Sequence, residues 1–170
     1  MSDSRRRETT AGERTGGHHD CAELTVVEPA VAREDVDSSG RVGAVAYPYR
    51  VYEAVATIER PLLSDLDVEY VVSVDRSRRL AVRADVFPET VTERIDDVLV
   101  VPSELSDERV REKAEAAVFT WTLRKIAVHS APEVTFERTV DAYKLYWLAS
   151  RPDGDVIVDS VRGTESPLED

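Results

Sequence analysis

The sequence contains one cysteine and no long apolar run. Cys21 alone excludes an internal disulfide and a zinc site built from several cysteines. No stretch of about 18 apolar residues occurs, so we predict no transmembrane helix and expect no membrane partner. Three arginines (Arg5, Arg6 and Arg7) stand near the N-terminus, but no apolar segment follows them. An export signal needs such a segment, so we expect a cytoplasmic protein.

The common catalytic and nucleotide-binding motifs are also missing. The sequence has no G-x-G-x-x-G, no Walker A loop and no G-x-S-x-G, so we predict no catalytic residue and no cofactor. His18, His19, Asp20 and Cys21 are of metal-ligand types, but adjacent residues in a flexible segment rarely converge on one ion, so we predict no metal site. His129 follows a predicted helix, where a lone histidine more often supports the helix carbonyls than acts as a base.

Lysine is scarce, although the chain is highly charged. Lys113, Lys125 and Lys144 are the only lysines among 22 basic residues, against 34 acidic residues and a net charge of -12. In its preference for arginine, its valine-rich strands and its acidic ends, the chain resembles uncharacterised protein families of halophilic archaea. This resemblance implies that the acidity keeps the surface solvated in molar salt, so the net charge does not predict a basic ligand.

One long helix is predicted from Ser106 to Val128. Ser106 stands where an N-cap belongs, and carboxylates follow it in the first turn. Arg124 and Lys125 lie in the last turn, where cations are favoured. Apolar residues recur from Val110 at spacings of three and four, which predicts one buried stripe.

Strand patterns lie on both sides of this helix. Residues 67–74 and 80–86 alternate between apolar and polar positions across a short link. They follow a segment of residues 47–59 that is rich in β-branched and aromatic residues. After the helix, residues 142–149 and 156–161 flank a Pro-Asp-Gly turn. We therefore expect an α+β fold in which an antiparallel sheet of five to seven strands packs on one long helix, ordered as β-meander, helix, β-meander. The predicted core is Val68, Tyr70, Val72, Leu80, Val82, Val118, Trp121, Leu145, Trp147 and Val156.

The chain divides by composition into one domain and two tails. Residues 1–43 are rich in Gly, Ser, Thr and charge, which predicts a disordered or loosely attached tail. Residues 44–165 carry the strand and helix patterns and are predicted to form a single domain, and residues 166–170 form a short acidic tail.

The C-terminal part carries a second resemblance. The helix segment EKAEAAVFTW is followed by strands and by YWLASRPDGDVIVDSVRGTE, in which Asp159–Gly163 has the form D-x-x-x-G. Over roughly the last 60 residues this resembles PepSY-type domains of cystatin-like shape. The resemblance implies inhibitory or regulatory binding without catalysis.

The most unusual local feature is a basic hairpin in an acidic protein. Three tyrosines on a nearby strand add stacking surfaces, so the candidate binding residues are Arg76, Arg78, Arg79, Arg83, Tyr47, Tyr49 and Tyr52. The alternative, which we favour, is a solvated hairpin whose arginines pair with Glu69, Asp75 and Asp85.

The sequence is compatible with three functions. The first, which we favour, is a non-enzymatic binding or regulatory module with an unknown protein partner or with itself, as a homodimer through the second face of the sheet. The second is a nucleic-acid-binding protein that uses the arginine hairpin. The third is a small-ligand carrier or enzyme with a pocket between helix and sheet.

Overall fold

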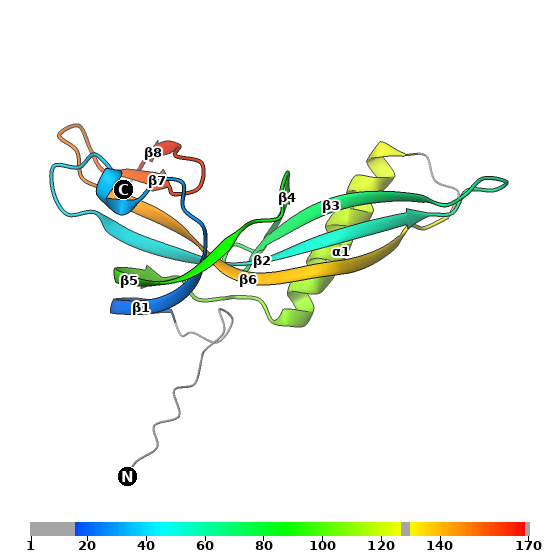
Figure 1. Ribbon diagram of the computed structural model, residues 1–170, viewed down its shortest axis with the longest axis horizontal. Coiled ribbons are helices and arrows are strands. Elements are labelled where there is room, and N and C mark those ends of the chain that lie inside the picture. The colour runs from blue at the N-terminus through cyan, green and yellow to red at the C-terminus, as the bar shows by residue number, and fades with distance from the viewer. Residues whose placement is uncertain (1–15, 127–129, 169–170) are drawn as a thin grey trace, which may run out of the picture.

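The computed structural model describes residues 16–126 and 130–168 (Figure 1). Within them the chain forms eight strands, one helix and one short 3-10 turn. In chain order these are β1 (Gly17–Val27), η1 (Arg33–Asp35), β2 (Gly43–Ile58), β3 (Leu66–Asp75), β4 (Leu80–Ala84), β5 (Thr90–Val100), α1 (Asp107–Lys125), β6 (Glu133–Ala149), β7 (Val156–Asp159) and β8 (Glu165–Pro167).

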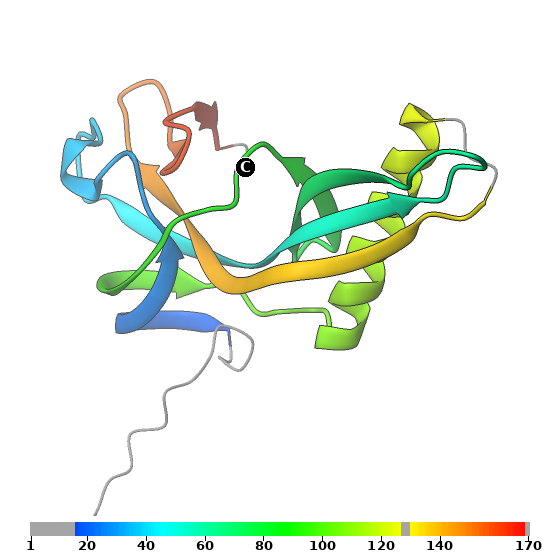
Figure 2. The ribbon, with the colours of Figure 1, turned by 45° about the vertical axis from the view of Figure 1, so that its right-hand side comes forward.

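Two long antiparallel strands, β2 and β6, form the backbone of the molecule. They pair from Gly43 with Leu148 to Thr57 with Glu133, with one irregularity between Glu53 and Ala54. The two strands extend along nearly the full length of the folded molecule. A separate group of elements packs against each end of them (Figures 1 and 2).

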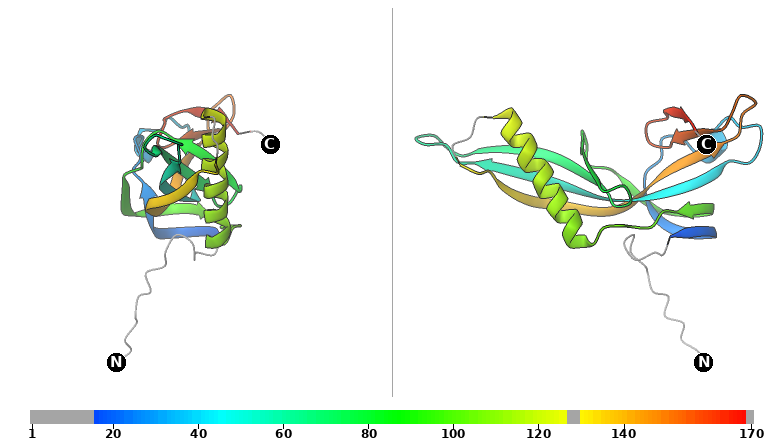
Figure 3. Two further views of the ribbon diagram at one scale, coloured as in Figure 1. Left: turned by 90° about the vertical axis from the view of Figure 1, so that its right-hand side faces the viewer. Right: turned by 180° about the vertical axis from the view of Figure 1, so that it is seen from behind.

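At one end, α1 covers a sheet made of β4, β3, β2 and β6, as the rear view shows (Figure 3). Ser106 caps the helix by accepting a hydrogen bond from the backbone N–H of Arg109. Val110, Ala114 and Val118 lie one turn apart on the buried stripe and pack on Tyr70 and other sheet residues. The predicted cap and stripe are confirmed, and the helix ends at Lys125; residues 127 and 128 of the predicted span lie outside the described residues.

At the other end, β1 and β5 form an antiparallel ribbon that packs on β2, β6 and β7. β5 joins β2 through a short parallel pairing of Val98–Val100 with Ala44–Ala46. β1 joins β6 through a single parallel pair, Val26 with Tyr143. These junctions produce a half-open barrel around a second core, which includes Leu24 and Trp147.

The predicted antiparallel sheet of five to seven strands, arranged as meander, helix and meander, is wrong. The sheet is mixed and has eight strands among the described residues, in the order β4-β3-β2-β5-β1-β6-β7-β8. The prediction assigned β1 to a tail and placed no strand over most of β5, because residues 92–97 carry five polar side chains on a strand that leaves one face in solvent.

The prediction of a loose N-terminal tail is also wrong for residues 17–43. Leu24 and Val26 of β1 are fully buried. Hydrogen bonds hold the segment after β1, among them those from Trp147 Nε1 to the carbonyl of Val31 and from the N–H of Ser39 to the carbonyl of Ser150. Residues 1–15, which belong to the same predicted tail, lie outside the described residues.

The predicted core is correct except on β4. Tyr70, Val72, Val118, Leu145 and Trp147 are buried, and Val68, Trp121 and Val156 pack at the margins of the two cores. Leu80 and Val82 are exposed, at 54% and 50%. The register pairs Ala81 with Val74 and Arg83 with Val72, so these residues take the helix side of β4, and Leu80 and Val82 take the other.

Candidate functional site

The seven predicted binding residues do not form one surface. Arg76 is 3% exposed, although it belongs to the same hairpin link as the exposed residues Arg78 and Arg79. Its side chain donates to Ser103 Oγ, to the carbonyl of Leu105 and to Asp107 Oδ1, at 3.0, 3.0 and 2.8 Å. Arg76 therefore fixes the start of α1 to the β3–β4 link and is withdrawn from any ligand surface.

Arg76 belongs to a network of four charges at the middle of the β2–β6 ribbon. Arg50 binds Asp141 with two parallel hydrogen bonds, of 2.6 and 2.7 Å, and hydrogen bonding to Asp141 raises the pKa of Arg50. Asp107 lies 3.4 Å from Arg50, and Asp141 lies 3.7 Å from Arg76. Because two arginines face two carboxylates, the network is neutral, and its chemistry is structural rather than anion binding.

Arg78, Tyr47 and Tyr49 are brought together as predicted. The Arg78 guanidinium binds Asp75 at 2.6 Å, donates to the Tyr49 hydroxyl at 3.1 Å and lies 4.9 Å from the centre of the Tyr47 ring. Burial by itself raises the pKa of Asp75, but hydrogen bonds from the backbone N–H of Arg78 and from Ser77 outweigh burial and lower it. Of the three carboxylates named for a solvated hairpin, Asp75 pairs with Arg78, whereas Glu69 and Asp85 form no ion pair within the described residues.

The remaining predicted residues lie elsewhere. Arg83 stacks over Tyr70 on the helix side of the sheet, where Tyr52 also packs against Phe136. Arg79 is exposed, and Glu104 lies 3.8 Å from it. The structure thus places Arg78 with two tyrosines on one face, Arg83 and Tyr52 on the other, and Arg76 inside.

A hollow of about 550 Å³ lies at the half-open barrel. It is lined by six consecutive β5 residues, Val91–Asp96, by five residues between Glu28 and Glu34, and by Trp147 of β6. A second hollow of about 440 Å³ continues from it along residues 36–42. Together we call these the β5 groove, which sequence analysis missed because its lining residues lie far apart in the chain and form no motif.

The backbone of β5 is open toward this groove. β2 pairs only with Val98–Val100 of β5. The residues that precede β2 in the chain do not continue this pairing along the earlier part of β5. The N–H of Glu28 donates to the carbonyl of Glu89. Along an antiparallel pair, the backbone N–H and C=O groups of successive residues point alternately toward the partner strand and away from it. The N–H and C=O groups of Thr90, Thr92 and Arg94 therefore face away from β1, on an edge that has no other strand among the described residues.

Asp97 lines the second hollow of the groove. Its backbone has a φ of 48°, which is uncommon for a residue other than glycine, and its carboxylate binds both Arg41 and His18, the latter at 2.6 Å. Hydrogen bonding from His18 is the main reason why the pKa of Asp97 is lowered. Its carbonyl also accepts a bond of 3.5 Å from Arg33, so Asp97 ties the η1 loop to β5.

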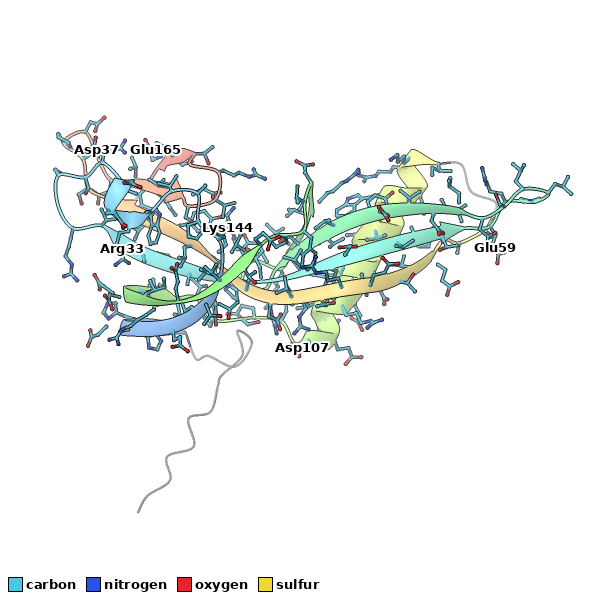
Figure 4. All side chains as sticks on the ribbon, in the orientation of Figure 1. Arg33, Asp37, Glu59, Asp107, Lys144 and Glu165 are labelled. Carbon is cyan, nitrogen blue, oxygen red and sulfur yellow. The ribbon has the colours of Figure 1, made fainter. Side chains whose placement is uncertain are left out.

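The groove has an apolar floor and a charged rim. Arg33 lies 5.3 Å from the centre of the Trp147 ring, on the β5 side of η1 (Figure 4). Glu28, Glu34 and Glu93 are exposed at the rim and form no ion pair within the described part of the chain. Such a site is suited to holding a polypeptide through backbone bonds, apolar contact and charge. Among the described residues no group of three His, Cys, Asp or Glu side chains is arranged to hold a metal, and no helix is long and apolar enough to cross a membrane.

No protein-family model, no curated protein and no solved structure matches the chain.

Proposed function

We propose that the protein is a non-enzymatic binding module that takes an extended segment of a partner protein along the open edge of β5. The observation that carries this proposal is that the unpaired edge at Thr90–Arg94 borders the 550 Å³ hollow of the β5 groove. Strand addition to a free sheet edge is a recurring mode of peptide recognition, in which backbone bonds supply affinity and pockets for alternate side chains supply specificity.

The groove also indicates the chemistry of the partner segment. A strand added to β5 turns every second side chain toward Val91, Ile95 and Trp147, and these positions favour apolar residues. The rim carboxylates, Glu28 and Glu34 among them, favour basic residues at flanking positions. The proposed ligand is therefore an extended peptide with alternating apolar residues and basic flanks.

The arginine hairpin supports nucleic-acid binding less well. Arg76 is buried, and Arg78 is neutralised by Asp75 at 2.6 Å. Binding to a phosphate backbone depends on cationic side chains that displace counterions from the phosphates, and in the hairpin only Arg79 and Arg83 have no short hydrogen bond to a carboxylate. We therefore place the partner at the β5 groove rather than at the hairpin.

Selection of peptides from a displayed random library, followed by fluorescence anisotropy with the selected peptides, tests the proposal. We expect peptides of the alternating pattern. The variant Arg94→Pro removes one outward N–H without breaking the β1 ladder, because that N–H faces away from β1. It should weaken binding at least tenfold, as expected for loss of one or more backbone bonds worth about 1.4 kcal/mol in total.

The matched control is Arg94→Ala, which removes the same side chain but keeps the N–H. If strand addition is the binding mode, Arg94→Ala should bind within about twofold of wild type, which corresponds to roughly 0.4 kcal/mol. Equal losses in both variants would assign binding to the side chain, and no loss in either would place the peptide elsewhere. Either result contradicts the proposal.

A further inference from the structure

The two outer edges of the eight-stranded sheet, β4 and β8, are protected to different degrees. β8 is three residues long and contains Pro167, which cannot donate a ladder hydrogen bond. β4 has five residues, no proline and no lysine, and pairs with β3 on one side only among the described residues. Natural sheets usually guard their edges with lysine, proline or very short strands, so β4 is an edge left available for pairing.

The side chains of β4 are apolar where they meet solvent. Leu80 and Val82 are about half exposed and point away from α1, and Val86, two residues beyond the strand, is 75% exposed. This apolar row explains why sequence periodicity assigned Leu80 and Val82 to the core, because the pattern of a strand is the same whether the covering layer belongs to its own chain or to another.

We propose that β4 pairs antiparallel with β4 of a second copy, around a two-fold axis at Val82, to form a continuous sheet across a homodimer. In this register Val82 meets Val82 of the partner copy, and Leu80 meets Ala84. Every residue of the strand is paired, and a two-fold interface of this kind is self-complementary.

The charges that flank the strand fit the same register. Arg79 stands three residues before Val82 and Asp85 three residues after it, so each Arg79 lies opposite the partner copy's Asp85. Arg79 has only the exposed Glu104 at 3.8 Å, and Asp85 has no ion pair within the described residues. Two reciprocal ion pairs therefore become available on dimerisation. This inference concerns an edge separate from the β5 groove and does not depend on the function proposed for that groove.

Disulfide trapping tests the register directly. Val82→Cys is placed in a Cys21→Ser background, and Val86→Cys in the same background is the control, because it is more exposed but lies well away from the proposed axis. Under mild oxidation we expect rapid formation of a covalent dimer by Val82→Cys and little by Val86→Cys. Equal or slower cross-linking of Val82→Cys overturns the proposed register.

The mass in solution tests the dimer itself. Light scattering on the full chain should give twice the chain mass of 19.0 kDa. Val82→Lys, which adds an edge-guarding charge at an exposed position, should raise the dimer dissociation constant at least tenfold while the circular dichroism spectrum stays unchanged. A monomer mass for the wild type at every accessible concentration overturns the proposal, as does a dimer that survives Val82→Lys unchanged.

Discussion

The Arg50 guanidinium on β2 and the Asp141 carboxylate on β6 meet as a two-point pair, with N···O distances of 2.6 and 2.7 Å. The pair lies directly across the ribbon, because the strand register sets these two residues opposite each other. Both side chains are largely buried, at 15% and 20% exposure. The pair joins the two strands at the point where the first turn of α1 also arrives, through Asp107.

Removing one partner of this pair should be costly. Asp141→Ala removes the two-point partner of Arg50 and leaves Arg50 and Arg76 sharing Asp107 alone, so we expect a loss of about 2–4 kcal/mol in the free energy of unfolding. Urea denaturation followed by circular dichroism measures it. The double variant Arg50→Met with Asp141→Leu should recover much of that loss, because it leaves no buried charge of the pair behind; a double variant as unstable as the single one would contradict this account.

Arg76 and Arg79, which both belong to the β3–β4 link, should contribute very differently to the free energy of unfolding. Arg76→Ala removes three hydrogen bonds, including those to the Leu105 carbonyl and to Asp107 at the start of α1, so we expect a loss of about 3 kcal/mol. Arg79→Ala, three residues along the chain, should change stability by less than about 0.5 kcal/mol, as is usual for an exposed pair. Thermal unfolding of the two variants side by side checks this difference, and similar effects would show that Arg76 is not the anchor of the helix start.

Stability should fall in acid in a way that depends on Asp75 and Asp159. Burial opposes ionisation of Asp159, but Lys144 and the N–H groups of Arg162 and Val161 outweigh it, so its pKa is lowered, as is that of Asp75. A carboxyl whose folded-state pKa lies below 3.8 contributes stability that is present above that pH and is lost as the pH falls through the folded-state value. Melting temperatures from pH 7 to pH 2 should drop below about pH 4. In Asp159→Asn the protein should be less stable at pH 7 and the acid drop smaller, whereas Asp65→Asn, at an exposed position, should leave the curve unchanged.

The excess of acidic residues should make stability depend on salt. With 34 acidic and 22 basic residues, the folded chain repels itself at low ionic strength, and salt near 1 M shortens the screening length to roughly 3 Å. We propose that the acidity is a salt adaptation, and we expect the melting temperature to rise steadily with KCl up to molar concentrations. A melting temperature that is flat or falling in KCl would contradict this proposal.

The tip of the β2–β3 hairpin should tolerate and even favour a polar residue. Leu62 is fully exposed and has a φ of 64°, in the left-handed region that costs a leucine about 1 kcal/mol. Asparagine enters this region more easily, so Leu62→Asn should raise the free energy of unfolding by roughly 0.5–1 kcal/mol. Leu63→Asn, also exposed but without the positive φ, should have a smaller effect; equal effects would mean that lost apolar exposure, not backbone strain, is responsible.

Local signals in the sequence were enough to predict the helix but not the sheet. The Ser106 cap and the stripe that begins at Val110 act within one or two turns, so they can be recognised without knowing the neighbours. The partners of β5 depend on β1, a strand about 70 residues away that composition assigns to a tail. A period-2 pattern also shows that the faces of β4 differ without showing which of them α1 covers, and Leu80 and Val82 were misplaced for that reason.

The candidate site could not be predicted from the sequence either, because it also depends on contacts between residues far apart in the chain. Arg76, Arg78 and Arg79 look equivalent in sequence, and only the approach of Asp107 and Leu105 from α1 withdraws Arg76 from the surface. The β5 groove exists because the pairing of β2 with β5 stops after three residues, an event of tertiary structure that leaves no local mark in the sequence.

Hydrogen exchange on the complex with a library-selected peptide tests the central claim most directly. If the peptide adds a strand to β5, the outward amides of Thr92 and Arg94 should become protected on binding, while those of β4 and β8 keep their free-state exchange rates. Protection that appears on another edge, or on the face that holds Arg78 and Tyr47, with Thr92 and Arg94 unchanged, would contradict the assignment of the β5 groove as the binding site.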